Sequence, residues 1–406
     1  MTGMIFVKKT IGRCLFLTAL LFMVACERTQ DLRTDTTKTL LVYMAADNNL
    51  TYQASRNINL MRSSMGTDLE FANLLVYVDR KVYRSGLPDT SITALLHIHD
   101  YRIDTIKVYN PLNSADPAVL KEVIDDVVNN WKAESYGLLL WSHGMSWIPE
   151  PQMHAVAGNL GWTSMRDGPR TKTFATENLP NDAYTCMELD ELADAIPDGV
   201  FDFIAFDACY MGSVEVAYAL RNKAQYIVSS SCEIIDEGFP YETVTRDFIN
   251  CNLLKMCSEF YSAYNRKGGW YQTASISLVN TYGLDSLARC FKKIVATHKA
   301  KIPTLDVSDI QRFDRFKKHV MFDLEDFVDK LGTNRDDLME FRLQLEKCIP
   351  YKNCTPYICS RYPDDPDGIK MVSFCGLSVF IPLEAFEASG LNDDYRDTEW
   401  CRDTEY

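Results

Sequence analysis

Residues 201–209 read Phe-Asp-Phe-Ile-Ala-Phe-Asp-Ala-Cys, and the continuous apolar run at 203–206 leads directly into an aspartate and a cysteine. A short apolar run that does not alternate with polar residues is typical of a strand buried on both faces of a largely parallel sheet. Further runs of this kind stand far apart in the chain, at residues 40–44, 74–78, 138–141, 226–228 and 377–381. Together they predict the central sheet of an α/β protein.

Helical patterns fill several of the intervals between these runs. The clearest pattern begins with Asp116 as an N-cap and Pro117 at the first helical position, and an apolar stripe follows. Weaker helical patterns cover residues 51–65, 188–196 and 212–223. Strands that alternate with helices predict an α/β sandwich with right-handed connections.

Two segments depart from this alternation. Residues 81–109 hold short β-branched and aromatic stretches separated by turn residues, which predicts a small antiparallel excursion of the sheet. Residues 147–184 are rich in glycine, proline, threonine and asparagine without any period, which predicts a long loop.

The composition is that of a folded soluble protein. The chain has 406 residues, of which 47% are apolar and 24% are charged, so disordered, collagen-like and coiled-coil classes are excluded. Lys and Arg total 42 against 56 Asp and Glu, which gives a formal charge of −14, and no basic run is present. We therefore expect no nucleic-acid partner.

The N-terminus carries the pattern of an export signal at residues 1–25. Lys8, Lys9 and Arg13 precede an uncharged stretch at residues 14–25, which is too short to cross a membrane as a helix. The pattern predicts that the mature protein acts outside the cytosol.

The signal ends in Met-Val-Ala-Cys, and the small residue before Cys26 resembles a bacterial lipobox, although Met23 stands where leucine is usual. We therefore predict lipidation of Cys26 and a polar tether at residues 26–37. The protein would then be exported and lipid-anchored in an outer membrane or facing the periplasm, with no other membrane contact. The alternative is an ordinary signal peptide cut nearby.

Two of the apolar runs end in reactive side chains. One run leads into His143 and Gly144, and the other leads into Asp207 and Cys209. Ligands of open α/β sheets bind beyond the carboxyl ends of the strands, so both ends are candidates for an active site. A helix begins soon after Cys209, and we expect its positive end to favour the thiolate, while His143 could hold the proton.

The alternative for each residue is structural. A cysteine after a strand is often a small buried apolar residue, and a histidine at a strand end is often a hydrogen-bonding residue of the core. Periodicity alone does not place the two residues on neighbouring strands.

The motifs WSHG at 141–144 and FDACYMG at 206–212 resemble those of the clostripain-type cysteine peptidases, which are relatives of caspases, legumains and gingipains. Residues 40–50, 230–241 and 376–382 also look like segments of that family, so the resemblance runs from about residue 38 to the end. It implies a caspase-like three-layer sandwich with a largely parallel central sheet flanked by helices.

The resemblance also implies an activity. His143 would be the catalytic base and acid, Cys209 the nucleophile that forms a thioester, and the N–H groups of Gly144 and Cys209 the oxyanion hole. Family members prefer Arg or Lys on the acyl side of the cut bond, so the expected partners are proteins or peptides with basic residues. The match for the pocket acid of the family is Asp207.

Asp207 has a physical argument and an alternative. Residues two apart on an extended chain face the same way, so Asp207 and Cys209 would line one wall of the pocket. An unpaired anion near the sulfur would raise the pKa of the thiol, so a cationic substrate residue or a hydrogen-bond donor should occupy Asp207. The alternative is a strand-end carboxylate that satisfies N–H groups of a loop.

The sequence also departs from the family. Self-cleavage after a basic residue is common there, but the basic residues between His143 and the cysteine run are confined to Arg166, Arg170 and Lys172. Calcium dependence is unsupported, because the aspartates at 364, 365 and 367 lack EF-hand spacing. We expect no cofactor to be required and no metal site.

The domain organisation expected from these features is a peptidase core at 38–300 and a C-terminal subdomain at 301–406 that completes the sheet. For the ten cysteines other than those at 14, 26 and 209, free buried thiols rank first, one or two disulfides second and zinc last.

The competing function is a non-catalytic surface lipoprotein that uses the same scaffold as a binding module. A binding protein does not require His143, Gly144 and Cys209 together, so the peptidase is favoured. The sequence holds no Gly-x-Ser-x-Gly elbow, His-Glu-x-x-His pair or phosphate loop, which removes the common serine, zinc and nucleotide enzymes.

Overall fold

The computed structural model describes residues 37–67, 71–82, 90–110, 112–149, 152, 156, 177–178, 184–359 and 368–406. Residues from Thr37 to Tyr406 form one unit. The predicted signal peptide, Cys26 and all but the last residue of the predicted tether lie outside the described residues. Arg166, Arg170, Lys172 and the three aspartates near 365 lie outside them as well.

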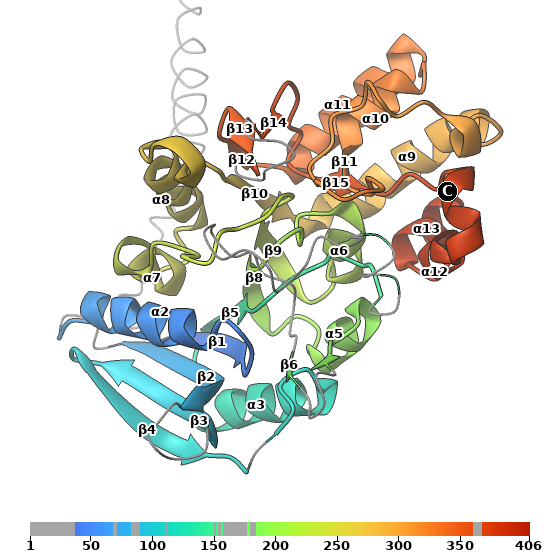
Figure 1. Ribbon diagram of the computed structural model, residues 1–406. Helices are drawn as coiled ribbons and strands as arrows, with labels where there is room; N and C mark the ends of the chain where they lie inside the picture. Colours follow the sequence, from blue (N-terminus) through green and yellow to red (C-terminus); the bar gives the residue numbers. More distant parts are fainter. Residues whose placement is uncertain are drawn as a thin grey trace, which may run out of the picture. The chain divides into compact units, whose positions relative to one another are not determined.

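Five parallel strands form the middle of the sheet (Figure 1). In spatial order they are β9 (Ala224–Ser229), β8 (Phe201–Asp207), β5 (Ser135–Trp141), β1 (Lys38–Ala46) and β2 (Ala72–Val82). All five coincide with predicted apolar runs, so the largely parallel sheet is confirmed.

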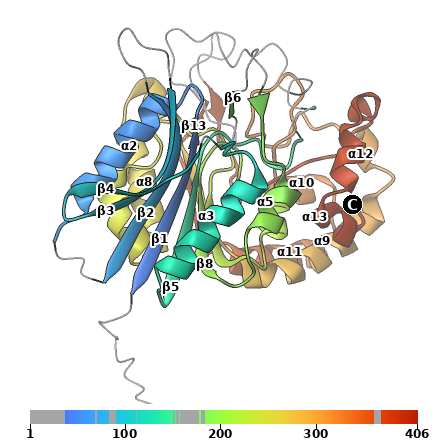
Figure 2. The ribbon, with the colours of Figure 1, turned by 90° about the horizontal axis from the view of Figure 1, so that it is seen from below.

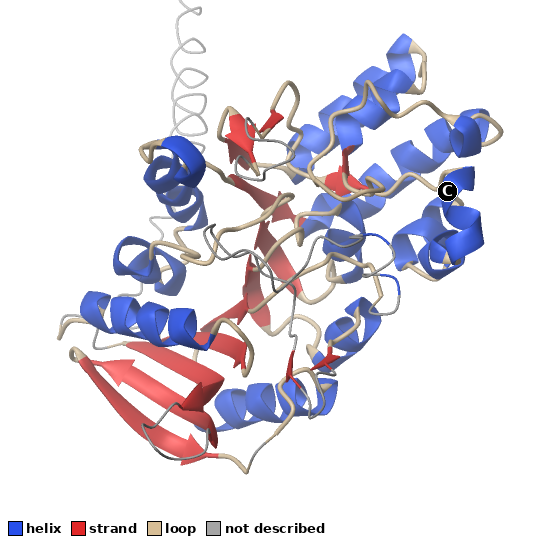
Figure 3. Ribbon diagram, viewed as in Figure 1, coloured by secondary structure: helices blue, strands red, loops and turns tan. Residues whose placement is uncertain are grey.

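Antiparallel strands extend the sheet at both edges, and Figure 3 shows them continuous with the parallel strands. Strands β3 (Thr90–His99) and β4 (Arg102–Val108) lie beyond β2, and β10 (Ser275–Asn280) and β12 (Tyr351–Cys354) lie beyond β9. The predicted antiparallel excursion is thus confirmed, and it belongs to the nine-stranded sheet itself.

Helices cover both faces of the sheet, which gives the three layers of a caspase-like sandwich (Figure 2). One face carries α2 (Thr51–Ser64), α7 (Tyr241–Ile249) and α8 (Leu253–Asn265). The other carries α3 (Pro117–Asn130), α5 (Leu189–Ala195), α6 (Val214–Ala219) and α9 (Leu284–His298). No helix within the described residues combines the length and the apolar character needed to span a membrane.

The remaining elements are short or lie near the C-terminus. They are the helices α10 (Leu324–Lys330), α11 (Arg335–Cys348), α12 (Leu391–Arg396) and α13 (Glu399–Thr404), the 3-10 helices η2 (Gly269–Tyr271), η3 (Thr281–Gly283), η4 (Ile302–Thr304) and η5 (Glu384–Ser389), and the strand pairs β6 (Glu177–Asn178) with β7 (Tyr184–Thr185), β11 (Phe322–Asp323) with β15 (Ser378–Val379), and β13 (Tyr357–Ile358) with β14 (Ile369–Lys370).

Helix α3 begins as the sequence predicts. Asp116 is its N-cap, and one carboxylate oxygen of this residue accepts a hydrogen bond from the Ala118 N–H at 2.8 Å. Pro117 occupies the first turn, where its missing N–H costs no helical hydrogen bond. The predicted apolar stripe is buried against the sheet.

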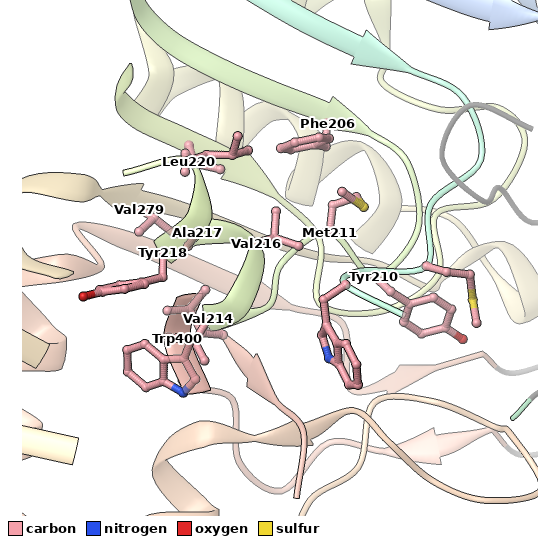
Figure 4. Close-up of a cluster of buried hydrophobic side chains, with 14 of the residues drawn as sticks. Phe206, Tyr210, Met211, Val214, Val216, Ala217, Tyr218, Leu220, Val279 and Trp400 are labelled. Carbon is pink, nitrogen blue, oxygen red and sulfur yellow. The ribbon is translucent and has the colours of Figure 1, made fainter. Parts of the chain in front are cut away.

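The strands separate the core into two layers, because successive side chains of a strand point to opposite faces. In β1, Leu41 and Tyr43 belong to one layer, whereas Leu40 and Val42 belong to the other. Figure 4 shows part of the first layer, where Val216 of α6 lies beneath Phe206 of β8.

One predicted strand of the central sheet is wrong. Of the apolar run at 377–381, only β15 is a strand, and it pairs with β11 outside the nine-stranded sheet. The Ser378 N–H donates to the carbonyl oxygen of Gly212 at 2.9 Å, which ties the run to the loop after β8. The apolar composition of the run reflects its burial under that loop.

Glu215 fixes the start of α6 to the C-terminal part of the chain. Its side chain is 1% exposed, and Oε1 accepts hydrogen bonds from the Phe380 N–H at 2.9 Å and the Tyr395 hydroxyl at 3.2 Å. Burial raises the pKa of Glu215 from 4.5 to about 7, and these hydrogen bonds only partly oppose the shift.

Because the folded pKa of Glu215 is raised, its contribution to stability is complete below pH 4.5 and is lost as the pH rises through about 7. Between pH 5 and pH 8, this titration should lower the free energy of unfolding of the wild type by about 2–3 kcal/mol. The neutral isostere Glu215→Gln should not show this loss of stability. Urea unfolding of both proteins at the two pH values measures it. The control is Glu346→Gln at an exposed position. Parallel pH curves for wild type and Glu215→Gln would contradict the assignment.

Candidate active site

The two reactive strand ends lie side by side. Strands β5 and β8 pair in parallel, and the register sets Trp141 opposite Asp207. His143 and Cys209 each follow two residues later, so both leave the same edge of the sheet from adjacent strands. The pairing of β5 with β8 therefore places His143 and Cys209 after neighbouring strands, which the periodicity of the sequence could not predict.

Gly144 brings the two loops into backbone contact. A Cβ atom at this position would lie 2.4 Å from the carbonyl oxygen of Cys209 and 3.0 Å from the side chain of Met211. No side chain fits there without a shift of the backbone, so glycine is required for this close approach. The residue after the candidate base thus contacts the candidate nucleophile.

His143 is held by a residue that the sequence reasoning missed. Its side chain is buried, and Nε2 lies 2.7 Å from Oδ1 of Asn49, which follows β1 and is exposed. The preceding Ser142 donates its hydroxyl hydrogen to the carbonyl oxygen of Ala45 at 2.8 Å. The turn after β1 therefore helps to orient the imidazole. Asn49 does lie in the segment 40–50 that resembles the family, which was its only signal in the sequence.

Cys209 is 1% exposed, and its sulfur meets the backbone of Ile234. The Ile234 N–H lies 3.3 Å from Sγ, and the Ile234 carbonyl oxygen lies 3.5 Å from it. The sequence had suggested the following helix as the source of positive potential, but α6 has only six residues and begins at Val214. The donor identified at the sulfur is instead the amide of Ile234.

Residues 209–212 are fixed against residues 230–234 by backbone contacts. The Tyr210 N–H donates to the Cys232 carbonyl oxygen at 3.1 Å, and the Gly212 N–H donates to the Ser230 carbonyl oxygen at 2.8 Å. A Cβ on Gly212 would lie 2.6 Å from backbone atoms of Ser230 and Ser231. The loop that carries the nucleophile therefore has little freedom to move.

Asp207 is fully buried at the end of β8. Its Oδ2 accepts hydrogen bonds from the Tyr241 hydroxyl at 2.7 Å and the Phe239 N–H at 3.2 Å. Burial and the neighbouring Asp207 raise the pKa of Tyr241 well above its usual value, so its hydroxyl keeps the proton that it donates. These donors come from within the chain, and they fit both the sequence argument, which required a donor at Asp207, and its alternative of a strand-end carboxylate that satisfies N–H groups of a loop.

Gly238 packs directly on this carboxylate. It has φ of +67°, and a Cβ atom would lie 2.3 Å from Oδ2 of Asp207. The Gly238 N–H donates to the Ile235 carbonyl oxygen at 2.9 Å, which closes a turn, and the Gly238 carbonyl oxygen accepts a hydrogen bond from the Tyr264 hydroxyl at 2.6 Å. The turn therefore determines how closely the chain covers Asp207.

The cysteines of the described residues are all free thiols, eleven in number. Burial raises the pKa of most of these thiols; the pKa of Cys232, for example, rises to about 11. In the same part of the chain, no cluster of three or more His, Cys, Asp or Glu side chains is arranged to hold a metal ion.

We predict that Gly238→Ala destabilises the protein by about 2 kcal/mol more than Gly199→Ala, because only the first substitution overlaps Asp207. Gly199 has φ of +65°, and apart from its chain neighbours no described residue comes within 4 Å of the place that its Cβ would take. Gly199→Ala therefore reports backbone strain alone, about 1 kcal/mol. Chemical denaturation of the two variants measures the difference. Equal losses of stability would show that Asp207 can move aside.

Comparison with known proteins agrees with this geometry. Residues 42–346 match the clostripain family of C11 peptidases. Clostripain from Hathewaya histolytica is 29% identical over 233 residues, which are 51% of this chain and 41% of clostripain, so the match spans less than half of that relative.

Two solved structures are similar over most of their length. An inactive zymogen C11 protease from Parabacteroides distasonis is 29% identical, with a TM-score of 0.74 over 91% of this chain and 98% of that one. A secreted C11 cysteine protease from Bacteroides thetaiotaomicron, in complex with an irreversible peptide inhibitor, is 27% identical, with a TM-score of 0.71 over 91% and 99%. The chain belongs to the clostripain family of cysteine peptidases.

Proposed function

We propose that the protein is a cysteine endopeptidase in which His143 and Cys209 form the catalytic dyad. The observation that carries this proposal is the register of β5 and β8, which delivers an imidazole and a thiol from adjacent strands to one edge of the sheet. Family membership supports the same chemistry.

In the proposed reaction, His143 takes the proton of the Cys209 thiol, and Sγ attacks the carbonyl carbon of the peptide bond. The tetrahedral oxyanion collapses, the C–N bond breaks, and His143 returns the proton to the departing amine. Water then attacks the thioester with His143 as base, which releases the acid and restores the thiol.

Backbone amides would stabilise the charges that develop. The N–H groups of Gly144 and Cys209 are the proposed oxyanion hole, and the glycine lets the two loops approach each other closely. The Ile234 N–H at 3.3 Å from Sγ favours the thiolate that attacks, whereas the Ile234 carbonyl oxygen, at 3.5 Å, accepts a hydrogen bond from the neutral thiol.

We also propose a preference for Arg or Lys on the acyl side of the cut bond, with Asp207 as the acidic group. The resemblance to the family and the place of Asp207 two residues before Cys209 support this preference. The two donors on Oδ2 are uncharged, and Asp207 is fully buried beneath Gly238, so the proposed attraction of a cationic side chain acts at a distance and not through a direct contact with the carboxylate.

Export and lipidation complete the proposal. The N-terminal pattern at residues 1–25 and Cys26 supports a mature protein outside the cytosol, tethered by a lipid. The similar Bacteroides thetaiotaomicron protease is described as secreted, which agrees with export.

The mature protein should hydrolyse fluorogenic peptides, and Cys209→Ala should lower kcat/KM by at least about 1,000-fold, because the proposed reaction has no other nucleophile. His143→Ala should have a similar effect. The matched control is Cys290→Ala on α9, which should retain activity. Binding of peptides without turnover by the wild type would favour the binding module, and full activity of Cys209→Ala would exclude the dyad.

Peptides with Arg or Lys before the reporter group should be cleaved faster than those with Asp or Asn. We expect Asp207→Asn to lower kcat/KM for the Arg and Lys peptides by about 10–100-fold, because it removes the charge and keeps the side-chain volume. Asp202→Asn on the same strand is the control. Equal discrimination by wild type and Asp207→Asn would assign specificity to another residue.

A further inference from the structure

Glu233 places a buried carboxylate beside the nucleophile loop. The residue is 5% exposed, and its Oε1 accepts hydrogen bonds from the Tyr210 hydroxyl and from the Nε–H of Arg315, each at 2.8 Å. Tyr210 directly follows Cys209, and Ile234 directly follows Glu233. Oε1 of Glu233 therefore connects two neighbours of the site. It binds Tyr210, which follows the nucleophile, and it belongs to the residue before Ile234, whose N–H lies at the sulfur of Cys209.

Arg315 reaches this carboxylate from the segment between α9 and α10, which Asp314 holds in shape. Asp314 is fully buried and accepts hydrogen bonds from three backbone N–H groups between residues 316 and 321, at 2.8–2.9 Å, and it lies 2.9 Å from Nδ1 of His319. The ring of Phe316 also packs on the ring of Tyr210, with 5.2 Å between centroids. Arg315 thus approaches Glu233 from a fixed support.

Tyr210 needs such support because its backbone is strained. It has φ of +59°, a region that residues with a side chain rarely adopt. Burial and then the charge of Glu233 raise the pKa of Tyr210 well above its usual value, so the hydroxyl remains a donor. The Tyr210 hydroxyl therefore keeps the proton that it donates to Glu233.

We propose that Glu233 is a positioning residue for catalysis, which, held between Tyr210 and Arg315, keeps the Ile234 N–H against Sγ of Cys209. The inference rests on the proposed function, since it assigns the thiolate of Cys209 a role in attack. It makes the segment after α9 part of the machinery that orients the nucleophile.

Other titratable groups face the same region. They are Cys232, Cys359 and Asp314, and burial raises the pKa of the two thiols above their usual value. Among the described groups that influence the pKa of Tyr210, the positively charged one is Arg315, and it forms an ion pair with Glu233. A substitution that changes the charge of this cluster would alter the thiol electrostatically, so the test needs variants that conserve charge.

Tyr210→Phe removes the hydroxyl hydrogen bond to Glu233, and Arg315→Lys removes the Nε hydrogen bond while it keeps a positive charge; both leave the formal charge unchanged. We expect the pH midpoint for alkylation of Cys209 by iodoacetamide to rise by about half to one unit in each variant, because the thiolate loses part of its N–H contact. Mass spectrometry of the peptide that contains Cys209 measures it. For Arg and Lys peptides, kcat should fall about 3–10-fold with little change in KM.

The matched control is Tyr218→Phe, which removes a similar hydroxyl-to-carboxylate hydrogen bond, of 2.7 Å to Asp403, from helix α6. Its alkylation midpoint should equal that of the wild type. Midpoints for Tyr210→Phe and Arg315→Lys that coincide with this control, or that fall, would overturn the proposal. Alkylation does not require peptide turnover, so an inactive wild type would defeat the proposed function and still leave the midpoints to decide the role of Glu233.

Discussion

The parallel pairing of β5 with β8 is the constraint on which the rest of the site depends. Because Trp141 is opposite Asp207, the loops that carry His143 and Cys209 leave the sheet at the same level. A slip of one residue would displace one loop by about 3.3 Å and turn every side chain of that strand to the other face. Both faces of the two strands are buried, so the apolar layers on either side resist such a slip.

The sequence was sufficient for most of the fold, because burial on both faces leaves a clear signal. Continuous apolar runs located the five parallel strands, and Asp116 with Pro117 located the start of α3. The run at 377–381 misled, because apolar composition reports burial and does not report which strand supplies the hydrogen bonds. That information resides in contacts between residues far apart in the chain.

The candidate site divides in the same way. His143, Gly144 and Cys209 were found because their residue types carry the chemistry and follow predicted strands. Ile234 lies in the segment 230–241 that resembles the family, but its role could not be assigned, since it acts through a backbone N–H that any residue but proline would supply. Tyr241 was also missed: its hydroxyl reaches Asp207 only because the turn that ends at Gly238 folds back over the end of β8.

Buried ionisable groups connect helix α6 and the loop after β9 to the last hundred residues. Glu233 meets Arg315, and Glu215 meets Phe380 and Tyr395. The desolvation of such groups offsets much of their attraction, so they are poor sources of stability, but an unsatisfied partner would be costly. The folded chain therefore accepts few arrangements of these segments other than the one that keeps the hydrogen bonds of Glu233 and Glu215. We infer that this selectivity, more than any gain in stability, is what the C-terminal segment contributes to the nucleophile.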